Sequence, residues 1–265
     1  MLEHGGRLRA AAQQYGILLS EWLDLSTGLA PWPFSFPAVP ASVWQRLPEA
    51  EDGLASVAAQ RYGAAQVLPV AGAQAAIQLL PQLRSAGSRV GIAAPCYAEH
   101  AHAWQRAGHQ LLGLRDEAIE AALDELDVLL LVNPNNPTGR VFAPAQLLAW
   151  HARLAERGGW LVVDEAFIDA TPELSLAAYS HLPGLIVLRS FGKFYGLAGV
   201  RLGFVLAEPG LLSELNERLG PWAVSGPARW LGLACLADET AHQQQSQRLQ
   251  QASQRLADLL GEYGL

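Results

Sequence analysis

Cysteine and clustered positive charge are both scarce in this sequence. The 265 residues include two cysteines, Cys96 and Cys235. Two isolated thiols build neither a disulfide framework nor a zinc-binding pattern, and they favour a reducing compartment such as the cytoplasm. The net charge is −7, and the sequence contains no basic run. The composition therefore argues against nucleic-acid binding.

Long hydrophobic runs are missing as well. The longest strongly apolar run, 128–132, is far too short to cross a membrane. The first seven residues lack the apolar core of a signal peptide, so we expect a cytoplasmic protein without a membrane partner. Hydrophobic residues make up 51% of the chain, which is enough for a substantial core. The length fits one large domain with an incomplete smaller one.

The segment 188–201 places a lysine between aromatic residues and glycines, and an arginine follows it. Bulky neighbours would exclude water from Lys193 and lower its pKa, which favours a nucleophilic amine and Schiff-base chemistry. The planar guanidinium of Arg201 suits a phosphate. Taken alone, however, the segment is better explained as a surface lysine in a glycine-rich loop.

Two further motifs precede this segment. Residues 133–139 read Asn-Pro-Asn-Asn-Pro-Thr-Gly, and Asp164 follows the apolar run 160–163. Each has an ordinary alternative, namely a turn asparagine and an edge carboxylate in a salt bridge. In their order and spacing, however, the three motifs resemble the fold-type-I pyridoxal-phosphate enzymes, the aspartate-aminotransferase superfamily. The resemblance implies pyridoxal 5′-phosphate as the cofactor.

The same resemblance implies roles for individual residues. Lys193 would carry the cofactor, and Asp164 would keep its pyridine nitrogen protonated, so that the ring acts as an electron sink. These two are the expected catalytic residues. Tyr97 would stack on the ring, and Asn136 would bond its phenolic oxygen. The other expected cofactor contacts are Gly72, Ala73, Gln74, Ser190 and Arg201.

The start of the chain resembles a narrower group, the threonine-phosphate decarboxylases of cobalamin biosynthesis. The resemblance rests on His-Gly-Gly at 4–6 and Asp-Leu-Ser-Thr-Gly at 24–28. In that group the arm folds over the active site and helps to hold the substrate phosphate. The expected substrate contacts are therefore His4, Gly5, Gly28 and Asn136. Composition alone would also suit a plain surface arm.

We predict a three-layer α/β/α sandwich with a mostly parallel sheet. Residues 1–35 would form the arm, 36–210 the large cofactor-binding domain, and 211–265 interdomain helices with a partial small domain. The hydrophobic pattern also predicts a helix over 48–63 and a strand over 201–206. Relatives build each site at a subunit interface, so the resemblance implies a homodimer.

Three functions remain open. The first is decarboxylation of O-phospho-L-threonine to aminopropanol phosphate for cobalamin biosynthesis. The second is an aminotransferase of the histidinol-phosphate type, in which Lys193 would shuttle a proton. The third is a shortened, inactive protein that binds the cofactor, because the arginine that grips the substrate carboxylate in relatives has no counterpart here. The arm and Phe167, where many aminotransferases carry tyrosine, favour the first over the second.

Overall fold

A computed structural model describes residues 4–264 of the chain, and within them seven strands form one sheet. The strand order is β1-β7-β6-β5-β4-β2-β3. Strand β7 runs antiparallel to β1 and β6, and the other pairs are parallel. The mostly parallel sheet is thus confirmed. The strands are β1 (Leu68–Val70), β2 (Arg89–Ala93), β3 (Gln110–Leu114), β4 (Val128–Val132), β5 (Trp160–Asp164), β6 (Leu185–Ser190) and β7 (Gly203–Leu206).

The central strand β4 shows why its sequence is continuously apolar. Leu129 and Leu131 belong to one hydrophobic cluster, whereas Val128 and Leu130 belong to another. All four side chains are fully buried. Successive side chains of a strand point to opposite faces, so a strand that is covered on both faces is apolar at every position.

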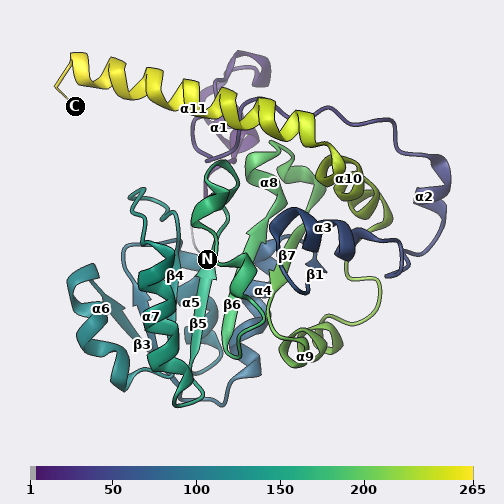
Figure 1. Cartoon of the computed structure of the whole chain (residues 1–265). Helices are drawn as coiled ribbons and strands as arrows, with labels where there is room; N and C mark the ends of the chain where they lie inside the picture. Colours follow the sequence, from purple (N-terminus) through teal and green to yellow (C-terminus); the bar gives the residue numbers. More distant parts are fainter. Residues whose placement is uncertain (1–3, 265) are drawn as a thin grey trace.

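Helices cover both faces of the sheet (Figure 1). Side chains of α4, α5 and α9 belong to one cluster, and those of α3, α6, α7 and α10 belong to the other. This arrangement confirms the three-layer α/β/α architecture. The helices are α1 (Leu8–Tyr15), α2 (Ala41–Gln45), α3 (Leu54–Tyr62), α4 (Ala73–Leu79), α5 (Ala98–Arg106), α6 (Asp116–Ala122), α7 (Pro144–Ala155), α8 (Phe191–Phe194), α9 (Pro209–Leu219), α10 (Gly226–Ala237) and α11 (Glu239–Glu262).

Two predicted boundaries were wrong. Helix α3 begins at Leu54 rather than at residue 48, because Gly53 adopts a left-handed conformation with φ of 91°. The Asp52 carboxylate accepts a hydrogen bond from the Leu54 N–H at 2.9 Å, which satisfies the first turn. Strand β7 begins at Gly203 rather than at Arg201, because Arg201 has φ of 56° and cannot continue a strand.

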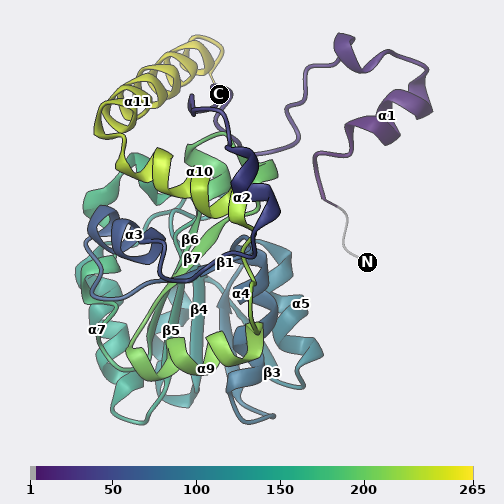
Figure 2. The ribbon, with the colours of Figure 1, turned by 90° about the vertical axis from the view of Figure 1, so that its right-hand side faces the viewer.

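The arm and α11 lie outside the sandwich. Helix α1 buries none of its residues and stands apart from the body in Figure 2. Helix α11 crosses the top of the molecule in Figure 1. The buried Gln245 fixes its first half, because its Nε2 donates to the carbonyls of Trp32 at 3.0 Å and Phe194 at 2.8 Å. The predicted domain limits remain a prediction.

In the described part of the chain, no helix combines the length and the apolar character that a membrane span requires.

Candidate active site

A cavity of about 140 Å³ lies at the carboxyl ends of β4, β5 and β6. Ligands bind at this edge in open α/β sheets. The wall contains each residue for which we predicted cofactor contact. These residues are Gly72, Ala73, Gln74, Tyr97, Asn136, Asp164, Ser190, Lys193 and Arg201. The fold thus brings together residues that are spread over about half of the sequence.

Asp164 ends β5 and is held by two partners. Its Oδ2 lies 2.8 Å from Nε2 of His100, and its Oδ1 accepts a hydrogen bond from the Ala166 N–H at 3.0 Å. Both side chains of the Asp164–His100 pair are buried. A buried carboxylate needs such partners, so His100 fixes Asp164 at the floor of the cavity. Sequence motifs did not point to His100; its position one helical turn after Tyr97 is the available signal.

Lys193 lies in the short helix α8 and lines the same cavity. Its Nζ is 5.4 Å from the centroid of the Phe167 ring. Burial lowers the pKa of Lys193; Asp164 opposes this effect, and Arg201 adds to it. A larger fraction of this amine is therefore neutral near pH 7 than in a free lysine, as a nucleophile requires.

Gly72, Ala73, Ser190 and Arg201 form a cradle of hydrogen-bond donors in the cavity wall. Gly72 has φ of 76°, and a Cβ atom there would come within 2.6 Å of Nη2 of Arg201. A Cβ atom on Gly203 would come within 2.4 Å of the backbone nitrogen of Ala73. Because both glycines lack a side chain, the guanidinium of Arg201 and the backbone N–H of Ala73 can approach the backbone near Ser190. This set of donors fits the phosphate of the expected cofactor.

Two asparagines of the 133–139 motif bond the protein backbone, whereas the third, Asn136, faces the cavity. Asn133 exchanges two hydrogen bonds with the backbone of Phe142, at 2.8 and 3.1 Å. Asn135 donates to the carbonyl of Pro95 at 2.9 Å. Asn136, in contrast, is exposed and lines the cavity. Its amide is therefore placed to meet a bound molecule.

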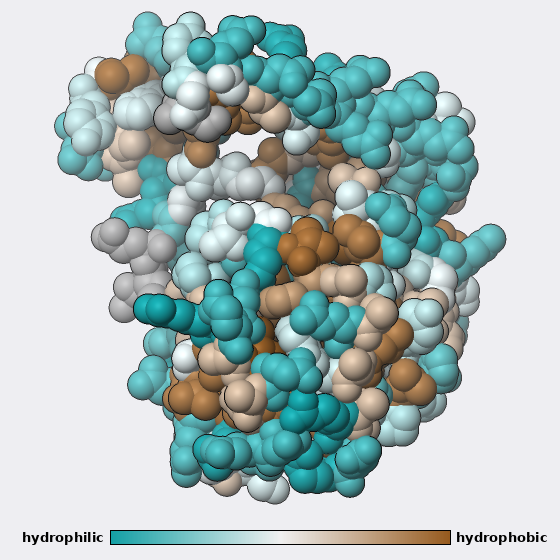
Figure 3. Space-filling model, turned by 60° about the vertical axis from the view of Figure 1, so that its left-hand side comes forward, coloured by the Kyte–Doolittle hydropathy of each residue, from teal (hydrophilic) through white to brown (hydrophobic). Residues whose placement is uncertain are grey.

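A second cavity, of about 590 Å³, adjoins the first between the arm and α11, where Figure 3 shows the molecule hollowed. Phe167 and Lys193 line both cavities, and Gly28 lines the second. A Cβ atom on Gly28 would lie 3.1 Å from the Phe167 ring, so the arm packs tightly there. The second cavity offers room for a substrate next to the amine of Lys193.

The other two predicted substrate contacts lie elsewhere on the arm. His4 bonds Glu99, with Nε2 and Oε1 2.8 Å apart, and its ring centroid is 6.0 Å from that of Tyr97. Gly5 packs on Ser26, whose carbonyl oxygen would be 2.0 Å from an added Cβ atom. Neither residue lines the two cavities described above.

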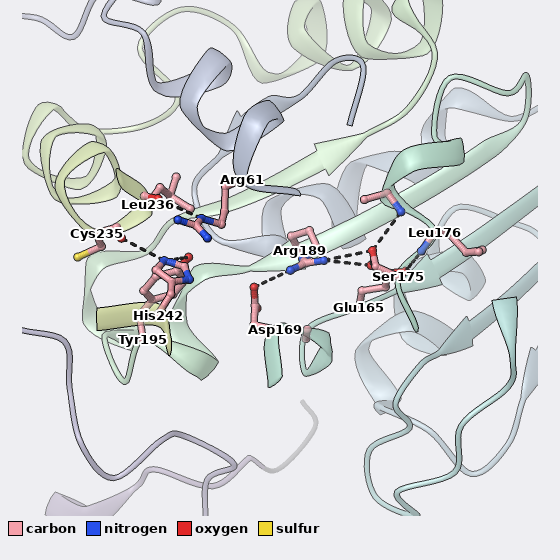
Figure 4. A network of polar contacts seen from close by, with 12 residues as sticks. Arg61, Glu165, Asp169, Ser175, Leu176, Arg189, Tyr195, Cys235, Leu236 and His242 are labelled. Carbon is pink, nitrogen blue, oxygen red and sulfur yellow. Dashed lines mark hydrogen bonds and ion pairs between the residues drawn. The ribbon is translucent and has the colours of Figure 1, made fainter. Parts of the chain in front are cut away.

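A buried charged network links Glu165 and Asp169 to Arg189 (Figure 4). Arg189 forms ion pairs with Glu165 at 3.2 Å and with Asp169 at 2.5 Å. Burial raises the pKa of Glu165, and the charge of Arg189 opposes that rise. Glu165 follows Asp164 and Arg189 precedes Ser190, so their pairing fixes the ends of β5 and β6. The available sequence signal for this network is Arg189, a charged residue within the otherwise apolar strand β6.

Replacing Gly72 by alanine tests the cradle. Gly72→Ala is expected to weaken cofactor binding at least about tenfold, or about 1.4 kcal/mol, because the new Cβ atom would displace Arg201 and strain a positive φ. Absorbance titration of the apoprotein with the cofactor measures this. Gly210→Ala is the matched control, since nothing lies within 4 Å of its Cβ position. Equal affinity of the two variants would contradict the assignment.

Known proteins resemble this chain in sequence and in fold. A model of the family "Aminotransferase class I and II" matches residues 43–265. A threonine-phosphate decarboxylase of Pseudomonas aeruginosa is 63% identical over 264 residues, which cover 100% of this chain and 80% of that protein. A threonine-phosphate decarboxylase of Sinorhizobium sp is 48% identical over 89% of this chain and 72% of its own length.

Solved structures show the same fold. The histidinol-phosphate aminotransferase of Sinorhizobium meliloti, solved in complex with pyridoxal-5′-phosphate, superposes with a TM-score of 0.76. The match has 24% sequence identity and covers 84% of this chain and 65% of that one.

Proposed function

The chain belongs to the class I and II aminotransferase family, and from this premise we propose that it decarboxylates O-phospho-L-threonine to aminopropanol phosphate. The main support for this proposal is that the whole chain is similar in sequence to threonine-phosphate decarboxylases. Pyridoxal phosphate is the cofactor. The product would supply cobalamin biosynthesis, as the resemblance of the arm implies.

Each wall of the small cavity has a task in this reaction. Bound pyridoxal phosphate supplies an electron sink for the electron pair that the departing carbon dioxide leaves behind. The partly buried amine of Lys193 would attach the cofactor and move protons. The carboxylate of Asp164, held by His100, would provide the negative charge opposite the pyridine nitrogen. Ser190, Arg201 and the loop at Gly72 would hold the phosphate.

The wall near Phe167 supports decarboxylation over the aminotransferase alternative. Many aminotransferases carry a tyrosine there, whose hydroxyl bonds the phenolic oxygen, and phenylalanine offers no such group. Asn136 would then be the main donor to that oxygen. The Phe167 ring packs against Gly28 of the arm, so the arm closes the cavity on this side. The substrate would bind in the larger cavity, where Lys193 is within reach.

Product analysis tests the proposed activity. The loaded protein is incubated with O-phospho-L-threonine, with and without a 2-oxoacid, and carbon dioxide and amino-acid products are measured. We expect carbon dioxide and aminopropanol phosphate in equal amounts, whether or not the oxoacid is present. Amino transfer that depends on the oxoacid would select the histidinol-phosphate type instead. A cofactor spectrum with neither product would select a binding protein.

We further propose that the protein is a cytoplasmic homodimer. The arm exposes several large apolar side chains, including Tyr15, Leu18, Leu23 and Leu25. An eight-residue helix such as α1 is marginal in water without packing, and a second chain would cover it. Sedimentation equilibrium at micromolar concentration is expected to give twice the monomer mass of 28.5 kDa. A stable, cofactor-loaded monomer would count against the proposal.

A further inference from the structure

Three polar side chains converge on the carboxylate of Glu99, in the first turn of α5. Oε1 lies 2.8 Å from Nε2 of His4. Oε2 accepts hydrogen bonds from Nε2 of Gln74 at 2.7 Å and from Nε2 of Gln78 at 3.1 Å. The Glu99 side chain is only 13% exposed, whereas that of His4 is 44% exposed. One oxygen thus faces the arm, and the other faces α4.

The α4 side of this cluster belongs to the cofactor cavity. Gln74 lines that cavity, and its Oε1 accepts a hydrogen bond from the Tyr97 hydroxyl at 3.4 Å. Partial burial, the largest single effect, raises the pKa of Glu99, but hydrogen bonds from His4 and Gln74 and the charges of His4 and His102 together lower it overall. The carboxylate is therefore anionic near pH 7, and it makes the stronger, charge-assisted type of hydrogen bond.

The other side of the cluster is the free end of the arm. The Gly6 N–H donates to Oγ of Ser26 at 2.8 Å, so that residues 4–6 run beside residues 24–26. Farther along, the Ala30 N–H donates to the carbonyl of Lys193 at 3.0 Å, and Gly28 packs on Phe167. The second half of the arm is thus fastened near Lys193, whereas Glu99 holds the start of the arm at His4.

We propose that Glu99 is a positioning residue that fastens the arm, through His4, to Gln74 at the start of α4. It fixes the arm wall of the substrate cavity without itself lining either cavity. Breaking this contact would free residues 4–6 and, through Ser26, loosen the stretch that leads to Gly28. The effect on substrate binding rests on the proposed function, whereas the effect on the arm does not.

The first test measures the arm in the cofactor-loaded protein without substrate. Trypsin cleavage after the exposed arm residue Arg9 is followed by mass spectrometry. Glu99→Ala and His4→Ala are each expected to accelerate this cleavage about tenfold, since each removes a hydrogen bond to a charged group. The double variant is expected to cleave no faster than either single one, because both remove the same contact.

Glu117→Ala is the matched control, since Glu117 is exposed and takes the same place in the first turn of α6 as Glu99 in α5. It loses the same helix-end charge and should cleave like the parent. Unchanged cleavage in the folded Glu99→Ala protein would overturn the proposal, as would additive effects in the double variant. If Glu99→Ala does not fold, His4→Ala decides alone, and unchanged cleavage in that folded variant overturns the proposal.

The second test separates positioning from general support. Glu99→Ala is expected to raise KM for O-phospho-L-threonine about tenfold and to change kcat by less than about threefold, as for lost uniform binding. If kcat instead fell about tenfold and the protein also lost its cofactor, Glu99 would have a merely structural role, and the proposal would be overturned. If the parent protein does not decarboxylate the substrate, only the proposed function is refuted. The trypsin test still shows whether Glu99 fastens the arm.

Discussion

Lys193→Ala is expected to lower decarboxylation by roughly 10³-fold or more, because a positioned acid–base group alone contributes about 10²–10⁴-fold. Lys193 supplies the amine that both cavities share. Its loss would remove the point of covalent attachment and the group that moves protons next to the substrate. The rate of carbon dioxide release from O-phospho-L-threonine measures the effect in enzyme saturated with the cofactor.

Lys193→Arg is the control for charge. It keeps a cation between Asp164 and Phe167, but a guanidinium does not lose its proton in proteins and is no nucleophile. It is therefore expected to be as inactive as Lys193→Ala. Because burial lowers the pKa of Lys193, its charged form destabilises the fold. The alanine variant should thus fold at least as stably as the parent below the pKa of free lysine. Activity of the arginine variant near the parent level would contradict the role of the amine.

Asp164→Asn is expected to retain much of the cofactor binding but to lower turnover by roughly 10²–10³-fold, or about 2.7–4 kcal/mol, the scale for one preorganised electrostatic group. The substitution preserves shape, and the amide oxygen can still accept from the Ala166 N–H. It removes the negative charge that His100 holds in place at 2.8 Å. A neutral partner no longer favours the protonated pyridine nitrogen, so the ring withdraws electrons less strongly.

Two measurements on Asp164→Asn separate these effects. Absorbance titration gives the affinity for the cofactor, and the rate of carbon dioxide release gives turnover. Weak cofactor binding with normal turnover at saturation would show that Asp164 serves only to hold the cofactor. Near-normal values of both quantities would exclude the electrostatic role altogether. Asp124→Asn, whose exposed carboxylate pairs with Arg153, serves as a matched control.

The sequence predicted the fold well because its signals are local. A strand that is buried on both faces must be apolar throughout, and β4 has that pattern at 128–132. The boundaries of α3 and β7 depended instead on the backbone conformations of Gly53 and Arg201. A hydrophobic pattern does not contain that information, and the two boundary predictions therefore failed.

The cavity residues were predictable for a different reason. Lys193, Asp164 and Asn136 stand in contiguous motifs, and the structure gathers them at one edge of the sheet. Their supporting residues were not predictable in this way. His100 and Glu99 act through partners that are 64 and 95 residues away in the sequence, so no motif connects them.

Composition holds one signal that the motifs do not convey. The chain contains 17 arginines but a single lysine, Lys193. Arginine replaces lysine readily at exposed positions where only a charge is needed, but it cannot supply a nucleophilic amine. The one place that retains lysine is the cavity at the carboxyl ends of β4, β5 and β6. This count supports the assignment of Lys193 independently of any resemblance.

The same count makes one measurement decisive. Borohydride reduction of the cofactor-loaded protein fixes pyridoxal phosphate to the amine that carries it, and intact-mass and peptide analysis then locate the label. Lys193 and the amino terminus are the only amines in the sequence. We predict one label per chain, on the peptide that contains Lys193, and none in Lys193→Arg. A label on the amino terminus, or an equal label in Lys193→Arg, would contradict the assignment of the cofactor to this cavity.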